Sequence, residues 1–264
     1  MADQEYLLHD QYGNSSNLRA RILLHERFSV NRRGFFRWFF DGLELPDNAR
    51  LLEVGCGSGR VWIENAHRIP PEWDITVSDF SEGMLADARR NLLPLRHPFH
   101  SAQIDAQRIP YSDGAFDVVI ANFMLYHVPN RDRALSEIRR VLTPHGTLYT
   151  ATNGETNLHE LRDVLRRVAP GQIEEEQREF TLENGTAQIA RHFARVEIHR
   201  YEDALLVTEI EPLMAYIRSW WTGQSLTDTA MAAVHEWAAR EIEEHGAVRI
   251  SKDSGVFEAR TGSE

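Results

Sequence analysis

A stretch of nine residues, LLEVGCGSG at positions 51–59, constrains the fold of this chain more than any other segment. Its first four residues predict a buried parallel strand. The three alternating glycines then predict a tight turn into an amphipathic helix over residues 61–68, because glycine accepts positive φ and has no Cβ. A ligand can lie almost against the backbone of such a turn. The segment is therefore predicted to be a ligand-binding strand–turn–helix unit.

The spacing of these glycines distinguishes between classes of ligand. They alternate as GxGxG, whereas dinucleotide dehydrogenases carry GxGxxG, and no Gly-Lys-Ser/Thr follows as a phosphate-cradling loop would require. With Glu53 just upstream, the pattern resembles motif I of the class I S-adenosylmethionine (SAM) methyltransferases. This resemblance implies that the backbone of the turn holds the amino-acid end of SAM. It also implies that Glu53 helps to anchor the ammonium group of the cofactor.

Acidic residues follow the next two predicted strands. DITVSD at 74–79 predicts a second strand that ends in Asp79, about where a βαβ unit presents a carboxylate to a ribose. SAQI at 101–104 predicts a short third strand, which is followed by Asp105. The carboxyl ends of successive parallel strands meet at one edge of a sheet, so we expect both carboxylates to face one site.

The remaining pattern continues the alternation of strands and helices. Ser81 predicts the cap of a helix that buries one apolar face. The apolar run at 116–125 predicts a fourth strand buried on both faces. Residues 139–152 predict a helix end, a proline-glycine turn and a fifth strand, and residues 196–201 predict a sixth strand. The segment at 247–257 suits an antiparallel seventh strand.

The order of these motifs resembles the methyltransferase domain of the ubiquinone/menaquinone biosynthesis type over residues 51–152. The resemblance implies an α/β fold: a doubly wound, Rossmann-like sheet of seven mostly parallel strands with an antiparallel last strand. It further implies that Asp79 holds the ribose and that Asp105 receives the adenine amino group. Ala106 and Gln107 would border the adenine ring. The residues expected to bind SAM, or the product S-adenosylhomocysteine (SAH), are Glu53, Gly55, Cys56, Gly57, Gly59, Asp79, Phe80, Met84, Asp105, Ala106, Gln107 and Asn122.

Methyl transfer makes modest demands on side chains, because the sulfonium of SAM already activates the methyl group and the enzyme must chiefly orient an acceptor and exclude water. His127 is the candidate catalytic base, since it follows the fourth strand and an imidazole titrates near neutral pH. The alternative is that His127 only hydrogen-bonds a loop. Tyr126 is expected to form part of the acceptor pocket wall. No metal is expected, because HEL at 159–161 lacks the second histidine of HExxH.

The chain is expected to divide into four zones. Residues 1–48 would form an N-terminal helical cover, whose aromatic segment at 35–40 covers one face of the sheet. Residues 49–203 would form the cofactor-binding core, and residues 204–246 a helical lid over the substrate crevice, with a homodimer interface as the alternative. Residues 247–264 would supply the final strand and tail. Solvated helix faces are expected for Arg19, Arg21, Arg32 and Arg33, with an acidic substrate as the alternative contact.

Composition limits the partners. The net charge of −11 argues against a nucleic-acid substrate, because such binding draws most of its affinity from a basic surface. The single Cys56 excludes an internal disulfide and suits a reducing cytoplasm. The sequence shows neither a secretory pattern nor an apolar run near the ~20 residues of a membrane span. We therefore expect a cytoplasmic protein without membrane association.

The predicted function is transfer of a methyl group from SAM to a small-molecule acceptor, in specialised metabolism. O-methylation is favoured over N- or C-methylation, because most small polar acceptors offer oxygen. A peptide carboxyl terminus is an alternative acceptor, since the long C-terminal excursion could admit an extended chain. The alternative classes are a non-catalytic SAM- or nucleoside-binding protein and an NAD-dependent oxidoreductase. The glycine spacing and the Asp105-Ala106 pair weigh against NAD.

Overall fold

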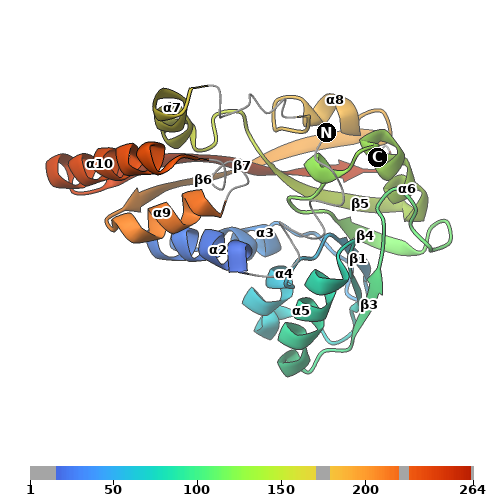
Figure 1. Ribbon diagram of the computed structural model, residues 1–264. Coiled ribbons are helices and arrows are strands. Elements are labelled where there is room, and N and C mark those ends of the chain that lie inside the picture. The colour runs from blue at the N-terminus through green and yellow to red at the C-terminus, as the bar shows by residue number, and fades with distance from the viewer. Residues whose placement is uncertain (1–15, 171–178, 220–225, 263–264) are drawn as a thin grey trace.

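The computed structural model of the protein describes residues 16–170, 179–219 and 226–262. A twisted seven-stranded sheet runs through the molecule in the order β3-β2-β1-β4-β5-β7-β6 (Figure 1). Strands β1 to β5 pair in parallel, and β7 runs antiparallel to both β5 and β6. This confirms the predicted fold. The strands are β1 (Arg50–Val54), β2 (Asp74–Asp79), β3 (Phe99–Gln103), β4 (Phe116–Ile120), β5 (Leu142–Asn153), β6 (Arg195–Val207) and β7 (Val248–Arg260).

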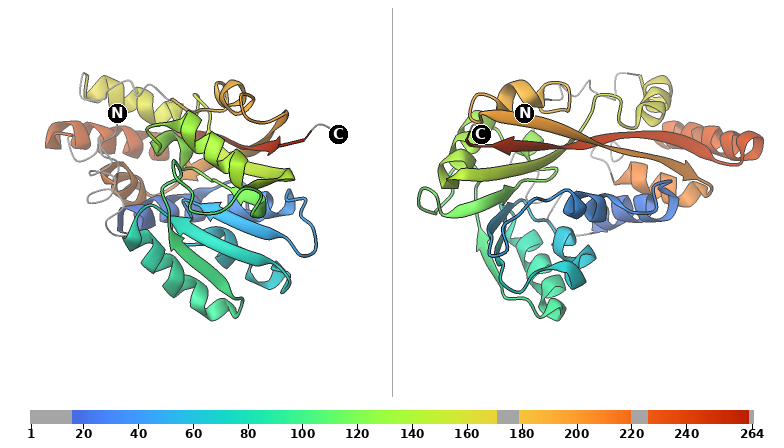
Figure 2. Two further views of the ribbon diagram at one scale, coloured as in Figure 1. Left: turned by 90° about the vertical axis from the view of Figure 1, so that its right-hand side faces the viewer. Right: turned by 180° about the vertical axis from the view of Figure 1, so that it is seen from behind.

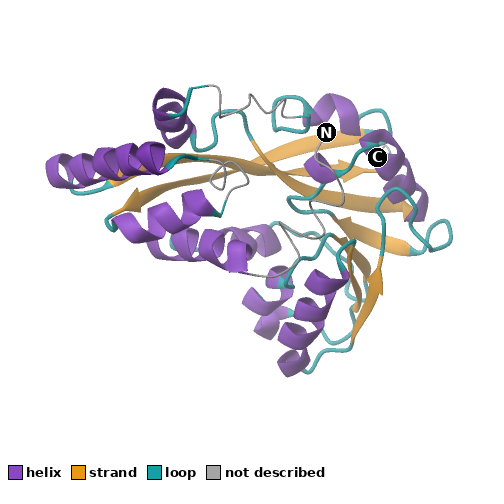
Figure 3. Cartoon of the chain, in the orientation of Figure 1, coloured by secondary structure: helices purple, strands orange, loops and turns teal. Residues whose placement is uncertain are grey.

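Helices connect the strands and cover the sheet on both sides (Figure 3). The α-helices are α2 (Ser16–Phe28), α3 (Phe35–Asp41), α4 (Arg60–Glu64), α5 (Glu82–Leu92), α6 (Arg131–Val141), α7 (His159–Val168), α8 (Gly185–Ile189), α9 (Ile210–Arg218) and α10 (Asp228–His245). Short 3-10 turns are η2 (Ala66–Arg68), η3 (Leu93–Leu95) and η4 (Leu125–His127).

The central strands are buried on both faces, because successive side chains of a strand point to opposite sides of the sheet. Leu51 and Val118 lie in one apolar layer with residues of α3, α4 and α5. Leu52 and Val119, each one position further along, lie in the opposite layer with residues of α6 and α8. The aromatic segment at 35–40 forms α3 and contributes two buried rings to the first layer.

Strands β6 and β7 extend beyond the carboxyl edge of the parallel strands. The register pairs Asn153, the last residue of β5, with Ser254 of β7, so residues 248–253 of β7 lie past that edge. Helices α2, α7, α9 and α10 contribute to a third apolar cluster around this extension, in which Leu205 and Ile250 are fully buried (Figure 2). The apolar stripes of α9 and α10 therefore cover the extended hairpin. Trp220, predicted as part of the α9 stripe, lies outside the described residues.

Two local signals act as predicted. Ser81 caps α5, since its Oγ accepts a hydrogen bond from the backbone N–H of Met84 at 3.3 Å. Helix α10 ends at Gly246, which has φ 80° in the left-handed region.

The predicted fourth strand is too long. Strand β4 ends at Ile120, and the chain then turns through Phe123, which has φ 55°, into η4. The side chain of Asn122 replaces part of the ladder, because its Oδ1 accepts the backbone N–H of Ala151 at 3.0 Å. The apolar run continued past the strand because Ala121 and Leu125 are buried in a turn.

Three other predicted boundaries also differ. The proline-glycine turn expected near residues 144–146 lies within β5, where the pairing with β4 shifts register between Phe116 and Val118. Strand β3 begins and ends earlier than the predicted 101–104, so Ile104 lies in the following loop. The sixth strand is longer than the predicted 196–201, because β6 pairs with β7 along its whole length.

Candidate active site

The glycine turn lies at the carboxyl end of β1, and its three glycines meet different constraints. Gly55, Gly57 and Gly59 all have positive φ, at 73°, 54° and 84°. A Cβ at Gly55 would lie 2.8 Å from the Cβ of Met124, and one at Gly59 would lie 3.2 Å from the side chain of Leu92. A Cβ at Gly57 would meet no atom of the described residues within 4 Å, apart from its two chain neighbours. Gly55 and Gly59 are thus needed for packing, whereas Gly57 leaves its backbone open to a ligand.

Asp79, at the end of β2, is bonded to this turn. Its Oδ2 accepts the backbone N–H of Gly57 at 2.9 Å, and its Oδ1 accepts that of Ser81 at 2.9 Å. Burial raises the pKa of Asp79, and backbone hydrogen bonds to the carboxylate oppose that rise. The structure thus places an acceptor group next to the open backbone of Gly57. A ribose contact of Asp79 stays a prediction.

Glu53 lies beneath the turn. Its side chain is buried, and its Oε2 accepts the indole N–H of Trp62, from α4, at 2.6 Å. Burial raises the pKa of Glu53 to about 8, so the carboxyl group is mostly neutral at pH 7. A neutral acid does not attract an ammonium group as an ion would. The expected contact with the cofactor ammonium would therefore require Glu53 to lose its proton.

Asn122 follows β4, the other neighbour of β1 in the sheet. It is 8% exposed. Its Oδ1 accepts from Ala151, and its Nδ2 has no hydrogen-bond partner among the residues that the structure describes. A buried donor without a partner is costly and calls for an explanation. A ligand with a hydrogen-bond acceptor would satisfy the Asn122 amide. The open Gly57 and the unpaired amide of Asn122 both fit a bound cofactor.

The loop after β3 is held by hydrogen bonds among its own side chains and backbone. Asp105 Oδ1 accepts both the backbone N–H of Gln107 at 2.9 Å and its Nε2 at 3.1 Å. Gln107 Oε1 accepts the backbone N–H of Asn130 at 3.1 Å, which links the loop to the start of α6. Ala106 is buried between them in the chain. An adenine amino group would share Asp105 with the Gln107 side chain.

The other predicted cofactor residues differ in accessibility. Phe80 is 38% exposed, directly after Asp79, and can contact a ligand. Cys56 and Met84 are buried, so a contact with a ligand would use the backbone or a small part of the side chain. Burial also raises the pKa of the Cys56 thiol, which makes it a poor nucleophile.

His127 ends the 3-10 turn η4, with the ring of Tyr126 edge-on to it at a centroid distance of 4.5 Å. Burial, together with the positive charge of Arg21, lowers the pKa of His127 to about 4. The expectation that His127 titrates near neutral pH is therefore wrong. Its imidazole is neutral at pH 7 and can accept a hydrogen bond, but it is a weak base.

Arg21 is the residue that sequence reasoning placed wrongly. We expected a solvated helix face, but its guanidinium is partly buried and contacts the end of α9. Its Nη2 donates to the backbone oxygen of Ser219 at 2.6 Å, and its Nε donates to Ser219 Oγ at 3.3 Å. Arg32 and Arg33 are exposed as expected, and the side chain of Arg19 lies outside the described part of the chain.

One group of described residues has metal-ligand geometry, away from the glycine turn. Glu197, His199 and Glu258 on β6 and β7 each place one ligand atom within 4.8 Å of the others. Both carboxylates already have a partner, because Arg195 pairs with Glu197 and Arg260 pairs with Glu258. The group is thus a network of ion pairs on the sheet edge.

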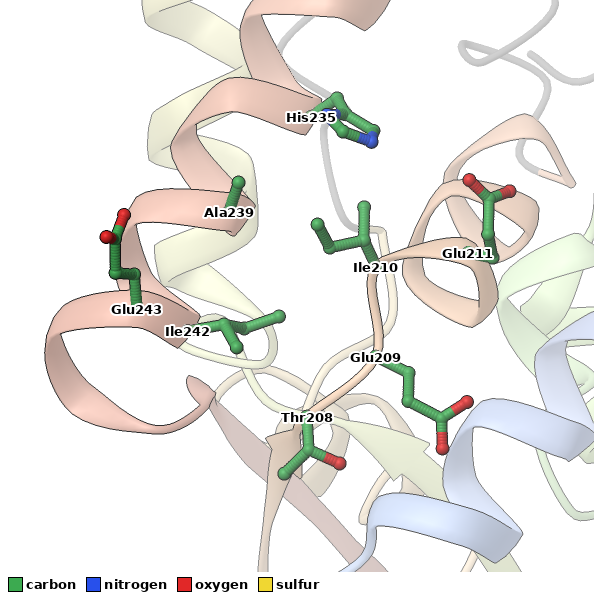
Figure 4. A pocket seen from close by; sticks show the side chains of 8 residues that line it. All are labelled: Thr208, Glu209, Ile210, Glu211, His235, Ala239, Ile242 and Glu243. Atoms are coloured by element: carbon green, nitrogen blue, oxygen red, sulfur yellow. The ribbon is translucent and has the colours of Figure 1, made fainter.

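A separate hollow of about 550 Å³ opens between α9 and α10 (Figure 4). It includes none of the residues predicted to bind cofactor or acceptor. Its lining residues are Thr208, Glu209, Ile210, Glu211, His235, Ala239, Ile242 and Glu243.

Among the helices of the described ranges, none is long and apolar enough to cross a bilayer.

Comparison with known proteins shows what the segment around the glycine turn is similar to. Residues 52–150 match the family model of a methyltransferase domain. A malonyl-(acyl-carrier protein) O-methyltransferase of Geobacter sulfurreducens is 34% identical over 165 residues, which cover 61% of this chain and 60% of that protein. A demethylmenaquinone methyltransferase of Lactobacillus johnsonii is 34% identical over 117 residues, which cover 44% of this chain and 48% of that protein.

A solved structure extends the likeness to the whole fold. Phosphoethanolamine N-methyltransferase 2 of Haemonchus contortus, in complex with SAM, has a TM-score of 0.60 and 16% identity, and the match covers 100% of this chain and 61% of that one. At this identity the match concerns the fold alone. The chain spans only 60% and 48% of the two sequence relatives, so their activities do not transfer directly to it.

Proposed function

We propose that residues 52–150, which match the family model of a methyltransferase domain, form a SAM-dependent methyltransferase of class I, and that the protein transfers the methyl group of SAM to a small-molecule acceptor. The observation that carries the proposal is the open backbone at Gly57, flanked in the sheet by the strands that bear Asp79 and Asn122. Asp79 and Asn122 each offer a polar group to a ligand that lies across the carboxyl edge, and Gly57 leaves room for that ligand against the backbone.

We assign roles to the residues around a bound cofactor as follows. The open turn at Gly57 allows close backbone contact, and Asp79 accepts hydrogen bonds from the ribose hydroxyls. The unpaired Nδ2 of Asn122 donates to the amino-acid end. Asp105 and Gln107 border the adenine ring. When bound, SAM supplies a methyl group on a positively charged sulfur, which needs no further activation.

The protein's own contribution to the reaction is then orientation of the acceptor and exclusion of water. The pKa of His127 near 4 makes its imidazole a neutral hydrogen-bond acceptor at pH 7. We therefore propose that His127 orients the acceptor by accepting a hydrogen bond from its hydroxyl or from a neighbouring group. As a weak base, it contributes little to removing the proton of that hydroxyl. O-methylation remains the favoured transfer, and the similar protein of Geobacter sulfurreducens is an O-methyltransferase by name.

Methyl transfer is tested by incubating the pure protein with SAM that carries a deuterated methyl group and a metabolite extract. Mass spectrometry then identifies the components that gain the label. We expect labelled products to form with the wild type and to decrease strongly with Asp79→Asn, which keeps the size of the side chain. Binding of SAM without any labelled product would instead favour the non-catalytic binding protein.

A further inference from the structure

The guanidinium of Arg21 is fixed at the junction of two helices. Helices α2 and α9 pack together through the apolar cluster that contains Leu24, Phe28 and Ile217. From this junction Arg21 donates two hydrogen bonds to Ser219, the residue that caps α9. Such bonds to a helix C-terminus are favourable, and they hold the planar group in one orientation. Arg21 is therefore a preorganised cation.

Arg21 has no acidic partner among the residues that the structure describes. Both of its hydrogen bonds go to a neutral serine, and its Nη1 has no hydrogen-bond partner in the described ranges. Other arginines nearby are paired: Arg27, further along α2, pairs with Glu209, and Arg60 pairs with Glu64. In a chain with 40 acidic and 29 basic residues, a partly buried arginine without a carboxylate is unusual.

Helix α2 lies beside the glycine turn, because Glu26 of α2 pairs at 2.9 Å with Arg60, the residue that follows Gly59. The charge of Arg21 also contributes to the lowered pKa of His127. His127 lies just after β4, at the carboxyl edge of the sheet where Gly57 and Asn122 also lie. A cap on α9 accounts for two of the donors of Arg21. It does not account for the Nη1 group, which has no hydrogen-bond partner in the described ranges.

We propose that Arg21 determines acceptor specificity by binding a carboxylate of the acceptor through its Nη1 edge. This inference rests on the proposed function and narrows it to acceptors that carry a carboxylate. A guanidinium suits this group because its planar donors match the two oxygens of a carboxylate. The imidazole of His127 is neutral at pH 7, so it is not a second cation to which the acceptor carboxylate could bind in place of Arg21.

The experiment uses protein saturated with SAH and a metabolite extract, in equilibrium ultrafiltration followed by mass spectrometry. Wild type is compared with Arg21→Gln, which removes the charge, and with Arg21→Lys, which keeps the charge without the planar fork. Arg27→Gln is the matched control, because it removes a paired surface arginine from the same helix. Melting temperatures identify any variant that fails to fold, and calorimetry gives the SAH affinity of each protein.

We expect the wild type to retain compounds that carry a carboxylate. Arg21→Gln should weaken their retention by about 10- to 100-fold, the effect of one charged hydrogen-bond pair. Retention by Arg21→Lys should lie between that of the wild type and that of Arg21→Gln. Retention by Arg27→Gln should equal that of the wild type. If Arg21→Gln does not fold, the comparison of Arg21→Lys with the wild type decides, because loss of the fork alone should weaken retention.

The proposal is overturned if the wild type binds SAH but retains only compounds without a carboxylate, or retains nothing. It is also overturned if both Arg21 variants retain the same carboxylates as strongly as the wild type. These outcomes leave the proposed function intact. Failure of the wild type to bind SAH would instead reject the cofactor site itself, and with it this inference.

Discussion

Gly57 offers a sharp test of the cofactor site, because the structure separates its backbone conformation from its surroundings. Alanine at this position would be strained, since φ is 54°, yet its methyl group would meet no atom of the described residues within 4 Å beyond its chain neighbours. Gly246, at the end of α10, also has a positive φ, 80°, and open space at its Cβ position within the described part of the chain. Gly57→Ala and Gly246→Ala therefore form a matched pair, of which only the first lies at the candidate site.

Both substitutions should cost stability by a similar amount. The left-handed conformation costs an L-residue about 1–2 kcal/mol. For a domain of this size that corresponds to a decrease in melting temperature of roughly 2–8 °C. Only Gly57→Ala should also affect the cofactor, because its methyl group would take the space of the ligand. An added methyl group in a packed site costs about 1–3 kcal/mol, or about 5- to 150-fold in Kd.

Thermal unfolding and isothermal titration with SAM measure the two effects independently. We expect equal losses of stability in both variants and a weaker Kd for SAM in Gly57→Ala alone. Gly59→Ala serves as a packing control, since its Cβ would lie 3.2 Å from Leu92 and should lower stability further. A Gly57→Ala protein that binds SAM with wild-type affinity would refute the view that a ligand lies against this backbone.

Three further predictions concern ionisable groups. Asp79→Asn should weaken SAM and SAH alike by about 10- to 100-fold in titration calorimetry, because a charged acceptor is lost, and equal affinities would contradict its role. Glu53→Gln should raise the melting temperature at pH 7. The carboxyl group of Glu53 is protonated in the folded protein up to its pKa of about 8, whereas in the unfolded chain it is protonated only below about 4.5. Folding at pH 7 therefore requires the uptake of a proton, and the substitution removes this cost. The gain should grow from pH 5 to pH 8, and a gain independent of pH would argue against a buried neutral acid. His127 has a pKa of about 4 in the folded protein and 6.5 in the unfolded chain. As pH decreases, the unfolded chain therefore binds the proton at a higher pH than the folded protein does, which favours unfolding. The stability of the wild type relative to His127→Asn, followed by urea unfolding, should therefore fall as pH decreases from 6.5 to 4, and a constant difference would refute the lowered pKa.

The parts of the fold that the sequence predicted are those with local signals. The glycine turn, the cap at Ser81 and the end of α10 at Gly246 each depend on residues within a few positions of one another. The alternation of strands and helices predicted the parallel sheet for the same reason. The end of β4 was missed because an apolar run shows burial and does not distinguish a strand from a buried turn.

The electrostatic properties of the site could not be predicted, because they arise from contacts between distant segments. Arg21 contacts Ser219 across 198 positions of sequence, and its charge acts on His127. The neutral state of Glu53 depends on burial beneath the turn, against the indole of Trp62. The sequence identified which residue types follow each strand. It did not show which of them the fold would bury, pair or leave without a partner.

We propose that the carboxyl edge around Gly57, Asp79 and Asn122 is a SAM site. Isothermal titration of the wild-type protein with SAM, SAH and NAD⁺ in parallel tests it most directly. We expect saturable binding of SAM and SAH to one site and no binding of NAD⁺ under the same conditions. Binding of NAD⁺ in preference to SAM, or no heat with SAM at any concentration, would contradict it.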